Sequence, residues 1–209
     1  MIELYNMDCM EYMAGLEDNA FDLAIVDPPY GIGESGGDKS RSRKYKRIVI
    51  HEKKQWDNDT PNQDYFNELY RVSKNQIMFG ANYYIDKLKP SMGWVYWDKN
   101  IGGDFSDGEL AYTSFKKALR AVQISFSHGT KGGHWRIHPT QKPVKLYEWL
   151  LKNYAKEGDK ILDTHLGSGS SAIAAHYAGF NFVGCELDKD YFNLAQERFD
   201  NETRQVAMF

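Results

Sequence analysis

The sequence predicts an α/β fold in which helices cover both faces of a mostly parallel sheet. Short apolar segments alternate along the chain with amphipathic segments of helical spacing. Two of the apolar runs, residues 23–26 and 182–185, are continuously apolar, as expected of strands buried on both faces. The chain has 209 residues, of which 42% are hydrophobic, so we expect residues 1–209 to form one domain.

Seven strands are expected, because seven short segments rich in apolar and aromatic residues are bounded by turn-forming residues. These segments are residues 2–5, 23–26, 76–79, 94–97, 122–126, 160–163 and 182–186.

The first expected helix follows residues 60–63. Thr60 and Gln63 have the spacing of a capping box, and Pro61 suits the first helical position. The apolar positions that follow recur at helical spacing, so we expect them to face the core. They are Tyr65, Phe66, Leu69 and Val72.

Three further helices are expected at residues 144–155, 170–178 and 190–201. Gly158 is expected to end the first of them, Gly179 ends the second, and Asp188 precedes the third. The residues expected to face the core are Tyr147, Leu150, Leu151 and Tyr154 in the first helix, and Phe192, Ala195 and Phe199 in the last.

Two long polar stretches interrupt this alternation, residues 31–58 and 100–137. Long loops in a compact domain are usually functional or disordered. Within the first stretch, residues 39–54 contain eight Lys or Arg and one acidic residue, although the formal net charge of the whole chain is -3. Such a charge run is either a solvated face or a local surface for nucleic acid.

Composition argues against several classes of protein. The two cysteines, Cys9 and Cys185, are isolated, so neither a disulfide framework nor a metal site is expected. Residues 1–11 lack the pattern of a signal peptide, and no apolar run is long enough to span a bilayer. We therefore expect a cytoplasmic protein with no membrane association.

The expected strand at residues 23–26 ends in Asp27-Pro28-Pro29-Tyr30. An exocyclic amine of a base is a poor nucleophile, because its lone pair is delocalised into the ring. A rigid carboxylate and a backbone carbonyl can accept its two protons and aim the lone pair outward, while prolines fix the carbonyl direction. An aromatic ring at the fourth position can stack on an extruded base. The alternative is a proline turn with a solvated Asp27.

A second constellation lies at residues 161–170, where an expected strand leads through a Gly-x-Gly turn into a helix. The backbone amides of such a turn can approach a ligand closely, and Glu186, at the end of the next strand, is placed for ribose hydroxyls. A simple tight turn and a nicotinamide dinucleotide site are the alternatives. Few residues follow Gly169, which argues against a whole dinucleotide fold beginning there.

Together these motifs resemble the amino-methyltransferases of DNA, and the order of the two motifs resembles the circularly permuted β group, with many phage and prophage members. Residues 7–9, 94–99 and 138–143 are similar to further motifs of that family, so the resemblance covers nearly the whole chain. Other β-group members more often carry Pro and Phe where this chain has Thr164 and His165.

The resemblance implies a Rossmann-like methyltransferase fold with S-adenosylmethionine as the cofactor. The implied catalytic residues are Asp27, Pro28, Pro29 and Tyr30. The implied cofactor-binding residues are Asp8 and Cys9 at the adenine, Glu186 at the ribose, Asp163, Gly167, Ser168, Gly169 and Ser170 at the methionine end, and Thr140, Gln141 and Lys142 on the other side. The alternative for residues 138–143 is a Pro-flanked helix cap.

Double-stranded DNA is the expected partner, bound by the basic loop 31–58 and by a small target-recognition insertion at residues 100–137. The expected DNA-binding residues are Lys39, Arg41, Arg43, Lys44, Lys46, Arg47, Lys116, Lys117 and Arg120. The sequence is compatible with a homodimer. The expected reaction is site-specific methylation of adenine, as in restriction-modification. The protein is expected to come from a bacterial host or to be encoded by a phage. Cytosine or RNA as the substrate, and a catalytically inactive nucleic-acid-binding module, remain the alternatives.

Overall fold

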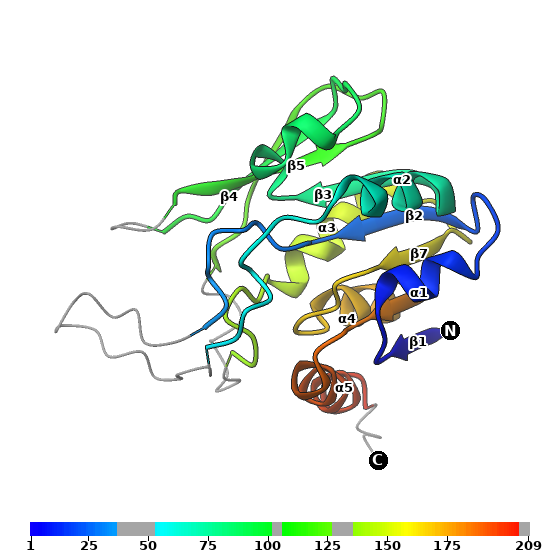
Figure 1. Cartoon of the computed structure of the whole chain (residues 1–209), viewed down its shortest axis with the longest axis vertical. Coiled ribbons are helices and arrows are strands. Elements are labelled where there is room, and N and C mark those ends of the chain that lie inside the picture. The colour runs from blue at the N-terminus through cyan, green and yellow to red at the C-terminus, as the bar shows by residue number, and fades with distance from the viewer. Residues whose placement is uncertain (37–52, 102–105, 127–135, 205–209) are drawn as a thin grey trace, which may run out of the picture.

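The computed structural model describes residues 1–36, 53–101, 106–126 and 136–204 (Figure 1). Within them, an eight-stranded sheet has the order β1-β8-β7-β2-β3-β5-β4-β6. The strands are β1 (Ile2–Tyr5), β2 (Phe21–Val26), β3 (Ser73–Phe79), β4 (Trp94–Asp98), β5 (Gly108–Thr113), β6 (Arg120–Gln123), β7 (Lys160–Asp163) and β8 (Asn181–Cys185).

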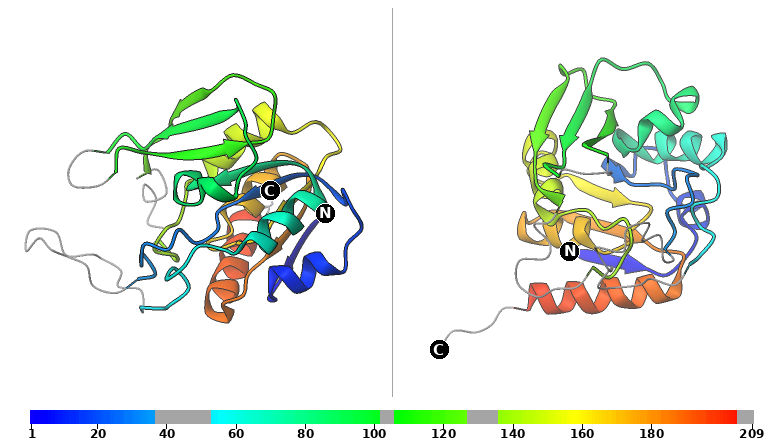
Figure 2. Two further views of the ribbon diagram at one scale, coloured as in Figure 1. Left: turned by 45° about the horizontal axis from the view of Figure 1, so that its top comes forward. Right: turned by 90° about the vertical axis from the view of Figure 1, so that its left-hand side faces the viewer.

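Helices cover both faces of this sheet, as the sequence predicts (Figure 2). The α-helices are α1 (Cys9–Ala14), α2 (Gln63–Val72), α3 (Val144–Tyr154), α4 (Ser170–Tyr177) and α5 (Lys189–Thr203), and two short 3₁₀-helices are η1 (Ala81–Tyr83) and η2 (Ile85–Lys87). One buried cluster packs α1 and α2 against the sheet, and the other packs α3, α4 and α5 against its opposite face.

Strand β2 lies at the centre and shows why both faces are covered. Its alternate residues Leu23 and Ile25 belong to the cluster beneath α3, and Ala24 and Val26 belong to the cluster beneath α2. All four are at most 2% exposed. Because successive side chains of a strand point to opposite faces, a continuously apolar strand needs a layer on each side.

The predicted count of seven strands is wrong, and the additional strand is β5. It pairs antiparallel with both β3 and β4, whereas the other pairings are parallel, so the sheet is mixed but mostly parallel. Strand β5 begins at Gly108 within a polar, Gly-interrupted stretch, which hides its short apolar run. Strands β5 and β6 both come from residues 100–137, so part of the expected insertion belongs to the sheet.

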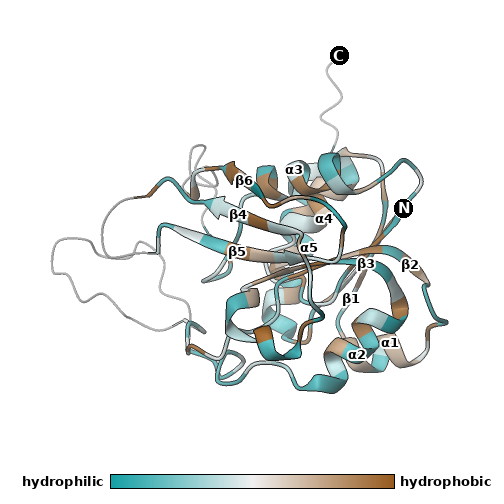
Figure 3. Cartoon of the chain, turned by 90° about the horizontal axis from the view of Figure 1, so that it is seen from above, coloured by the Kyte–Doolittle hydropathy of each residue, from teal (hydrophilic) through white to brown (hydrophobic). Residues whose placement is uncertain are grey.

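Helix α2 buries its predicted stripe, and Figure 3 shows hydrophobic and hydrophilic residues along it, but its start differs from the prediction. The side chain of Asn62, rather than Thr60, accepts the amide of Tyr65 and caps the helix. Helix α3 ends at Tyr154, one residue before the predicted end, and Gly158 does not end it but lies in the following turn with a φ of 86°. Helix α1, only six residues long, has too few residues to show a periodic pattern.

The sheet brings the expected functional residues to one edge. The carboxyl ends of β2, β7 and β8 lie at the same edge because these strands are parallel. Strand β5 runs in the opposite direction, so its first residues, rather than its last, reach this edge. Open α/β sheets bind ligands in crevices outside the carboxyl ends of their strands. In the described part of the chain, no helix is long and apolar enough to cross a membrane.

Candidate functional site

Two adjoining cavities open at the carboxyl edge of the sheet, with volumes of about 830 Å³ and about 590 Å³. The larger one is lined by the segments that follow β1, β7 and β8 and by the segment before α3, and the smaller one by β4, β5 and the loop after β2. Five residues line both cavities: Asp27, Pro29, Trp56, Thr140 and Lys142. Asp27 therefore lies where a ligand in one cavity would meet a ligand in the other.

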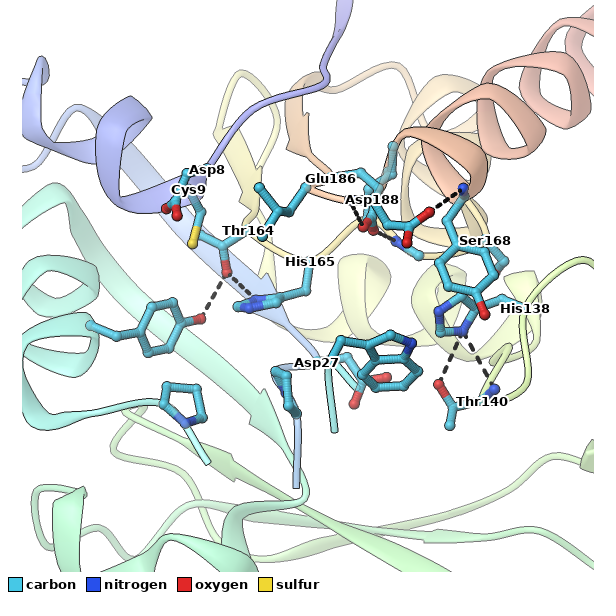
Figure 4. Close-up of a pocket in the computed structure, with 18 of the residues that line it drawn as sticks. Asp8, Cys9, Asp27, His138, Thr140, Thr164, His165, Ser168, Glu186 and Asp188 are labelled. Atoms are coloured by element: carbon cyan, nitrogen blue, oxygen red, sulfur yellow. Dashed lines mark hydrogen bonds between the residues drawn. The ribbon is translucent and has the colours of Figure 1, made fainter. Parts of the chain in front are cut away.

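Most of the expected cofactor residues line the larger cavity, and they come from distant parts of the chain. They are Asp8, Cys9, Thr140, Gln141, Lys142, Gly167, Ser168 and Glu186. In the view of Figure 4, Asp8 and Cys9 lie on one side of this cavity, Thr140 and Ser168 lie on the other, and Asp27 lies between them. The fold thus assembles three separate motifs around one space.

Glu186 holds the Gly-rich turn in place. One carboxylate oxygen accepts the amide of Gly167 at 2.9 Å, and the other accepts the amide of Asp188 at 2.9 Å. Gly167 has a φ of 53°, in the left-handed region, and a side-chain carbon there would approach nothing closer than His138 at 3.8 Å. The turn therefore presents open backbone to the cavity. Burial raises the pKa of Glu186, although the amides that it accepts oppose this shift.

Asp163, Gly169 and Ser170 lie behind this turn instead of lining the cavity. Asp163 is 1% exposed and accepts the amide of His165 at 3.0 Å and the hydroxyl of Ser171 at 2.5 Å. A side-chain carbon at Gly169 would lie 3.3 Å from the carbonyl oxygen of Ala195, so this side of the glycine packs against α5. The hydroxyl of Ser170 donates to the carbonyl of Lys142 at 2.8 Å. These residues support the cavity wall.

Asp27 lies at the centre of a buried polar network. One oxygen accepts the hydroxyl of Tyr30 at 2.5 Å, and the other accepts the ammonium of Lys142 at 2.5 Å. The same ammonium lies 3.3 Å from Glu109, whose second oxygen pairs with Lys99 at 2.7 Å. Two carboxylates thus face two ammonium groups, so the network is balanced in charge.

The ionisation of this network follows from its burial and its charges. Burial raises the pKa of Asp27, Lys142 lowers it and Glu109 raises it, with a net upward direction. Burial also raises the pKa of Glu109, but Lys142 and Lys99 together bring it below its usual value. Burial lowers the pKa of Lys142, and the two carboxylates more than offset this, so the ammonium stays charged.

The loop after Asp27 is fixed by Asp57, which sequence reasoning missed. Asp57 is 2% exposed, and its carboxylate accepts the amides of Tyr30, Gly31 and Glu34 at 2.7 to 2.9 Å. Its own carbonyl accepts the amide of Gly33 at 2.9 Å. A lone Asp in a polar stretch carries no distinguishing pattern in the sequence, so this role could be found only from the structure.

The stretches on either side of residues 37–52 are pinned together. The Ser35 hydroxyl donates to the Lys54 carbonyl, and the Lys54 amide donates to the Ser35 carbonyl. The ammonium of Lys54 pairs with Asp188 and Asp190 at the start of α5. We call residues 31–36 and 53–57 the stem; it adjoins both cavities through Trp56.

Comparison with known proteins gives the family. The DNA methylase family that includes N6 and N4 enzymes matches residues 84–197, more than half of the chain. The chain belongs to this DNA methylase family. The type II methyltransferase M.HpaI of Haemophilus parainfluenzae is 26% identical over 93% of this methylase and 73% of its own length. M2.DpnII of Streptococcus pneumoniae, also a type II methyltransferase, is 24% identical over 95% of this methylase and 90% of its own length.

Solved structures share the fold of this methylase. The M1.HpyAVI-SAM complex has a TM-score of 0.64 and 20% identity, covering 96% of this methylase and 100% of the other chain. PvuII DNA methyltransferase, described as cytosine-N4-specific, has a TM-score of 0.63 and 13% identity, covering 100% of this methylase and 88% of the other chain. The predicted methyltransferase fold is therefore confirmed, with eight strands in place of seven.

The expected DNA-binding residues of the methylase fall into two groups. Lys39, Arg41, Arg43, Lys44, Lys46 and Arg47 lie outside the described residues. Lys116, Lys117 and Arg120 lie at the opposite edge of the sheet from Asp27, since Arg120 pairs with Val95 near the beginning of β4. Lys117 donates there to the carbonyl of Asn153 at 2.8 Å. A DNA-binding role for these three residues stays a prediction, since the edge that they occupy is not the edge at which Asp27 lies.

Thr164 and His165, the two positions that differ from most of the β group, belong to a hydrogen-bonded chain in the methylase. Tyr65 bonds Thr164 at 2.7 Å through their hydroxyls, and Thr164 bonds His165 at 2.9 Å. All three line the larger cavity. Burial lowers the pKa of His165 to about 4, so this imidazole is neutral at pH 7. Among the described residues, no cluster of His, Cys, Asp or Glu suits a metal ion.

Proposed function

We propose that this methylase transfers a methyl group from S-adenosylmethionine to the amino group at carbon 6 of an adenine in double-stranded DNA. The observation that carries the proposal is the position of Asp27 on the wall that the two cavities share. One cavity holds the cofactor and the other holds the base, and the carboxylate meets the amine between them.

The larger cavity suits S-adenosylmethionine in size and in the chemistry of its lining. Its volume of about 830 Å³ lies within the usual range for small-molecule sites. Asp8 and Cys9 lie at the adenine, Glu186 at the ribose, and the Gly167–Ser168 turn at the methionine end. Gly167 leaves open backbone at the cavity, as close approach to a ligand requires. When bound, the cofactor supplies an activated methyl group.

The smaller cavity suits a base that has left the duplex. Aromatic residues from three separate segments line it, among them Tyr30, Tyr83 and Tyr96. An enzyme that modifies a base amine inside a duplex has to extrude the base, and stacking on aromatic rings stabilises the extruded base. Asp27 and the Pro28 carbonyl then accept the two protons of the amine, and the lone pair points toward the larger cavity. The methyl group moves directly to the amine, without a covalent enzyme intermediate.

Positioning supplies most of the catalysis in this proposal. Asp27 needs only to accept a hydrogen bond, because the amine can lose its proton after the transfer. Adenine is favoured over cytosine by the presence of Asp at position 27, where family members that prefer cytosine tend to have Ser. Cytosine at its exocyclic amine is the second candidate, since PvuII DNA methyltransferase, which shares the fold, is described as cytosine-N4-specific.

Replacement of Asp27 tests the proposal. Asp27→Ala removes an acceptor of the amine and leaves Asp8, Glu186 and the Gly167–Ser168 turn unchanged. We expect transfer of tritiated methyl groups to unmethylated DNA to be abolished, while cofactor affinity measured by calorimetry stays within a few-fold of the parent value. Mass spectrometry of nucleosides from DNA methylated by the parent protein identifies the base. Near-normal turnover by the variant, or methylcytosine as the product, would overturn the corresponding part of the proposal.

A further inference from the structure

The ammonium of Lys142 is buried and surrounded by acceptors. The side chain is 3% exposed, and its nitrogen lies 2.5 Å from Asp27, 3.2 Å from the Tyr30 hydroxyl and 3.3 Å from Glu109. An ammonium has three protons, so each can be matched with one of these oxygens. A buried charge requires such partners, and removal of one of them is costly. Lys142 is thus held by two carboxylates, one much nearer than the other.

Both oxygens of Asp27 already accept strong hydrogen bonds. Tyr30 donates to one of them and Lys142 to the other, each at 2.5 Å. In the proposed reaction, Asp27 has to accept a proton of the target amine instead. Lys142 lines both cavities, so it lies on the boundary that the amine must reach. An amine that reaches Asp27 there competes with Lys142 for the same carboxylate.

Glu109 is placed to receive Lys142. It lies at the beginning of β5, and because this strand runs antiparallel to its neighbours, its first residues reach the catalytic edge. One oxygen of Glu109 is already near Lys142, and the other pairs with Lys99 at 2.7 Å. Lys99 helps to lower the pKa of Glu109, so this carboxylate remains charged and able to take a second ammonium.

We propose that Lys142 occupies the place of the target amine at Asp27 in the free protein and moves to Glu109 when the base enters. Glu109 is then a positioning residue that acts on the reaction through Lys142. No proton is transferred in this exchange: Lys142 keeps its charge, and Asp27 replaces an ammonium donor with an amine donor. The inference rests on the proposed function, because it takes Asp27 as the acceptor of the amine.

The test replaces Glu109 by Gln and measures turnover with tritiated cofactor and unmethylated DNA. Without the second carboxylate, Lys142 stays on Asp27 and competes with the amine. We expect kcat/KM for DNA to fall about tenfold or more, since one charge-assisted hydrogen bond is worth roughly 1.5–3 kcal/mol and 1.4 kcal/mol is a tenfold change. Cofactor affinity, measured by calorimetry, stays at the parent value, because Glu109 lines only the smaller cavity.

A double-mutant cycle distinguishes this role from a structural one. In single-turnover assays with excess protein, Glu109→Gln should have little effect when Lys142 is already Met, because Glu109 acts only through that lysine. An equal loss of activity in the parent and Lys142→Met proteins, or full activity of Glu109→Gln, would overturn the exchange. Glu68→Gln is a matched control, since Glu68 pairs with Arg71 away from both cavities.

Two further measurements separate a folding defect from loss of the exchange, and failure of the exchange from failure of the proposed function. If Glu109→Gln folds poorly in urea unfolding, Glu109→Asp keeps the charge but shortens the reach to Lys142, and we expect a smaller loss of the same sign. Asp27→Ala, assayed in parallel, tests the proposed function on its own. Retained activity of Asp27→Ala would refute the proposed function, whereas full activity of Glu109→Gln with inactive Asp27→Ala would refute only the exchange of Lys142.

Discussion

The ring of Tyr30 lies nearly parallel to the ring of Tyr83, with centroids 5.0 Å apart and an interplanar angle of 12°. Gly80 is the reason that Tyr30 fits, since a side-chain carbon at this glycine would lie 2.0 Å from the Tyr30 ring. Tyr83 is 46% exposed and lines the smaller cavity. The aromatic surface expected at the end of the tetrapeptide is therefore a stacked pair, and the Tyr30 hydroxyl is engaged by Asp27.

The two functions of Tyr30 can be separated by substitution. Tyr30→Phe keeps the ring and loses the hydrogen bond to Asp27, so we expect lower kcat with DNA affinity near the parent value. Tyr30→Ala also loses the ring, and we expect DNA affinity to fall by roughly 1–3 kcal/mol, the usual contribution of one stacked base. Binding of unmethylated DNA with an unreactive cofactor analogue measures this difference. Equal affinity of the Phe and Ala variants would show that the base does not stack on Tyr30.

Asp57 should stabilise the fold as well as the site. Its carboxylate accepts three backbone amides next to Asp27, and Asp57→Ala leaves these amides without their partner. We expect the free energy of unfolding to fall by about 3 kcal/mol, because hydrogen bonds to a buried charge are among the stronger ones. Urea unfolding measures the loss, and Asp59→Ala, at a neighbouring exposed position, is the control. An unchanged unfolding free energy would contradict this role.

Asp163 should make stability depend on pH. Burial raises the pKa of its carboxyl to about 7, whereas an unfolded Asp titrates at about 3.9. Between these values the folded state holds a proton that the unfolded state has lost, so stability falls as pH rises through this window and then levels off. Asp163→Asn removes this dependence while keeping an acceptor for His165.

Relative to the parent protein, Asp163→Asn should therefore gain about 3 kcal/mol of unfolding free energy between pH 5 and pH 8. Urea unfolding of both proteins at the two pH values measures the change in their difference. His165, whose pKa burial lowers to about 4, adds an opposite slope to both proteins and cancels in the comparison. A difference that does not change with pH would show that Asp163 is already ionised at pH 5 in the folded protein.

The basic loop should contribute a salt-dependent part of DNA binding. Arg41, Arg43, Lys44 and Lys46 lie outside the described residues, but the stem fixes the chain on either side of them beside the smaller cavity. Neutralising all four should flatten the slope of log affinity against log salt by roughly 3 to 4, at about 0.9 for each phosphate contact. Because phosphate contacts carry little sequence information, the loss should be similar on any duplex.

The control for this experiment neutralises Lys145, Lys152 and Lys156, which are exposed on or just after α3. Their replacement by Gln should leave the salt slope unchanged. A slope equal to the parent value in the basic-loop variant would mean that those four residues form only a solvated face. Cofactor affinity serves as a check on folding in both variants.

The strands and motifs at the centre of the sheet could be predicted from the sequence because their signals are local. A continuously apolar run such as residues 23–26 is explained by burial on both faces, and the Gly-x-Gly turn follows from a strand that leads into a helix. The sequence also indicates that Gly169 needs its backbone freedom, with a φ of 74°, but not that α5 fills the space where a side-chain carbon would lie.

Residues that act through pairing across the sheet could not be predicted. Glu109 reaches Lys142 only because β5 is antiparallel, and no sequence pattern indicates that direction. Asp57 is 30 residues from Asp27 in the chain (57 minus 27) and has no motif of its own. The sequence also does not indicate that Lys116, Lys117 and Arg120 lie at the other edge of the sheet, since a positive charge in a polar stretch does not say which edge it will occupy.

Because of the stem, the position of the tetrapeptide after β2 does not depend on the number of residues between Ser35 and Lys54. Ser35 and Lys54 are bonded to each other, and Asp57 anchors the backbone at Tyr30, so the two ends of residues 37–52 are fixed independently of what joins them. The entropic cost of closing a loop grows only slowly with its length. We therefore expect insertions or deletions between Ser35 and Lys54 to leave the tetrapeptide in its place.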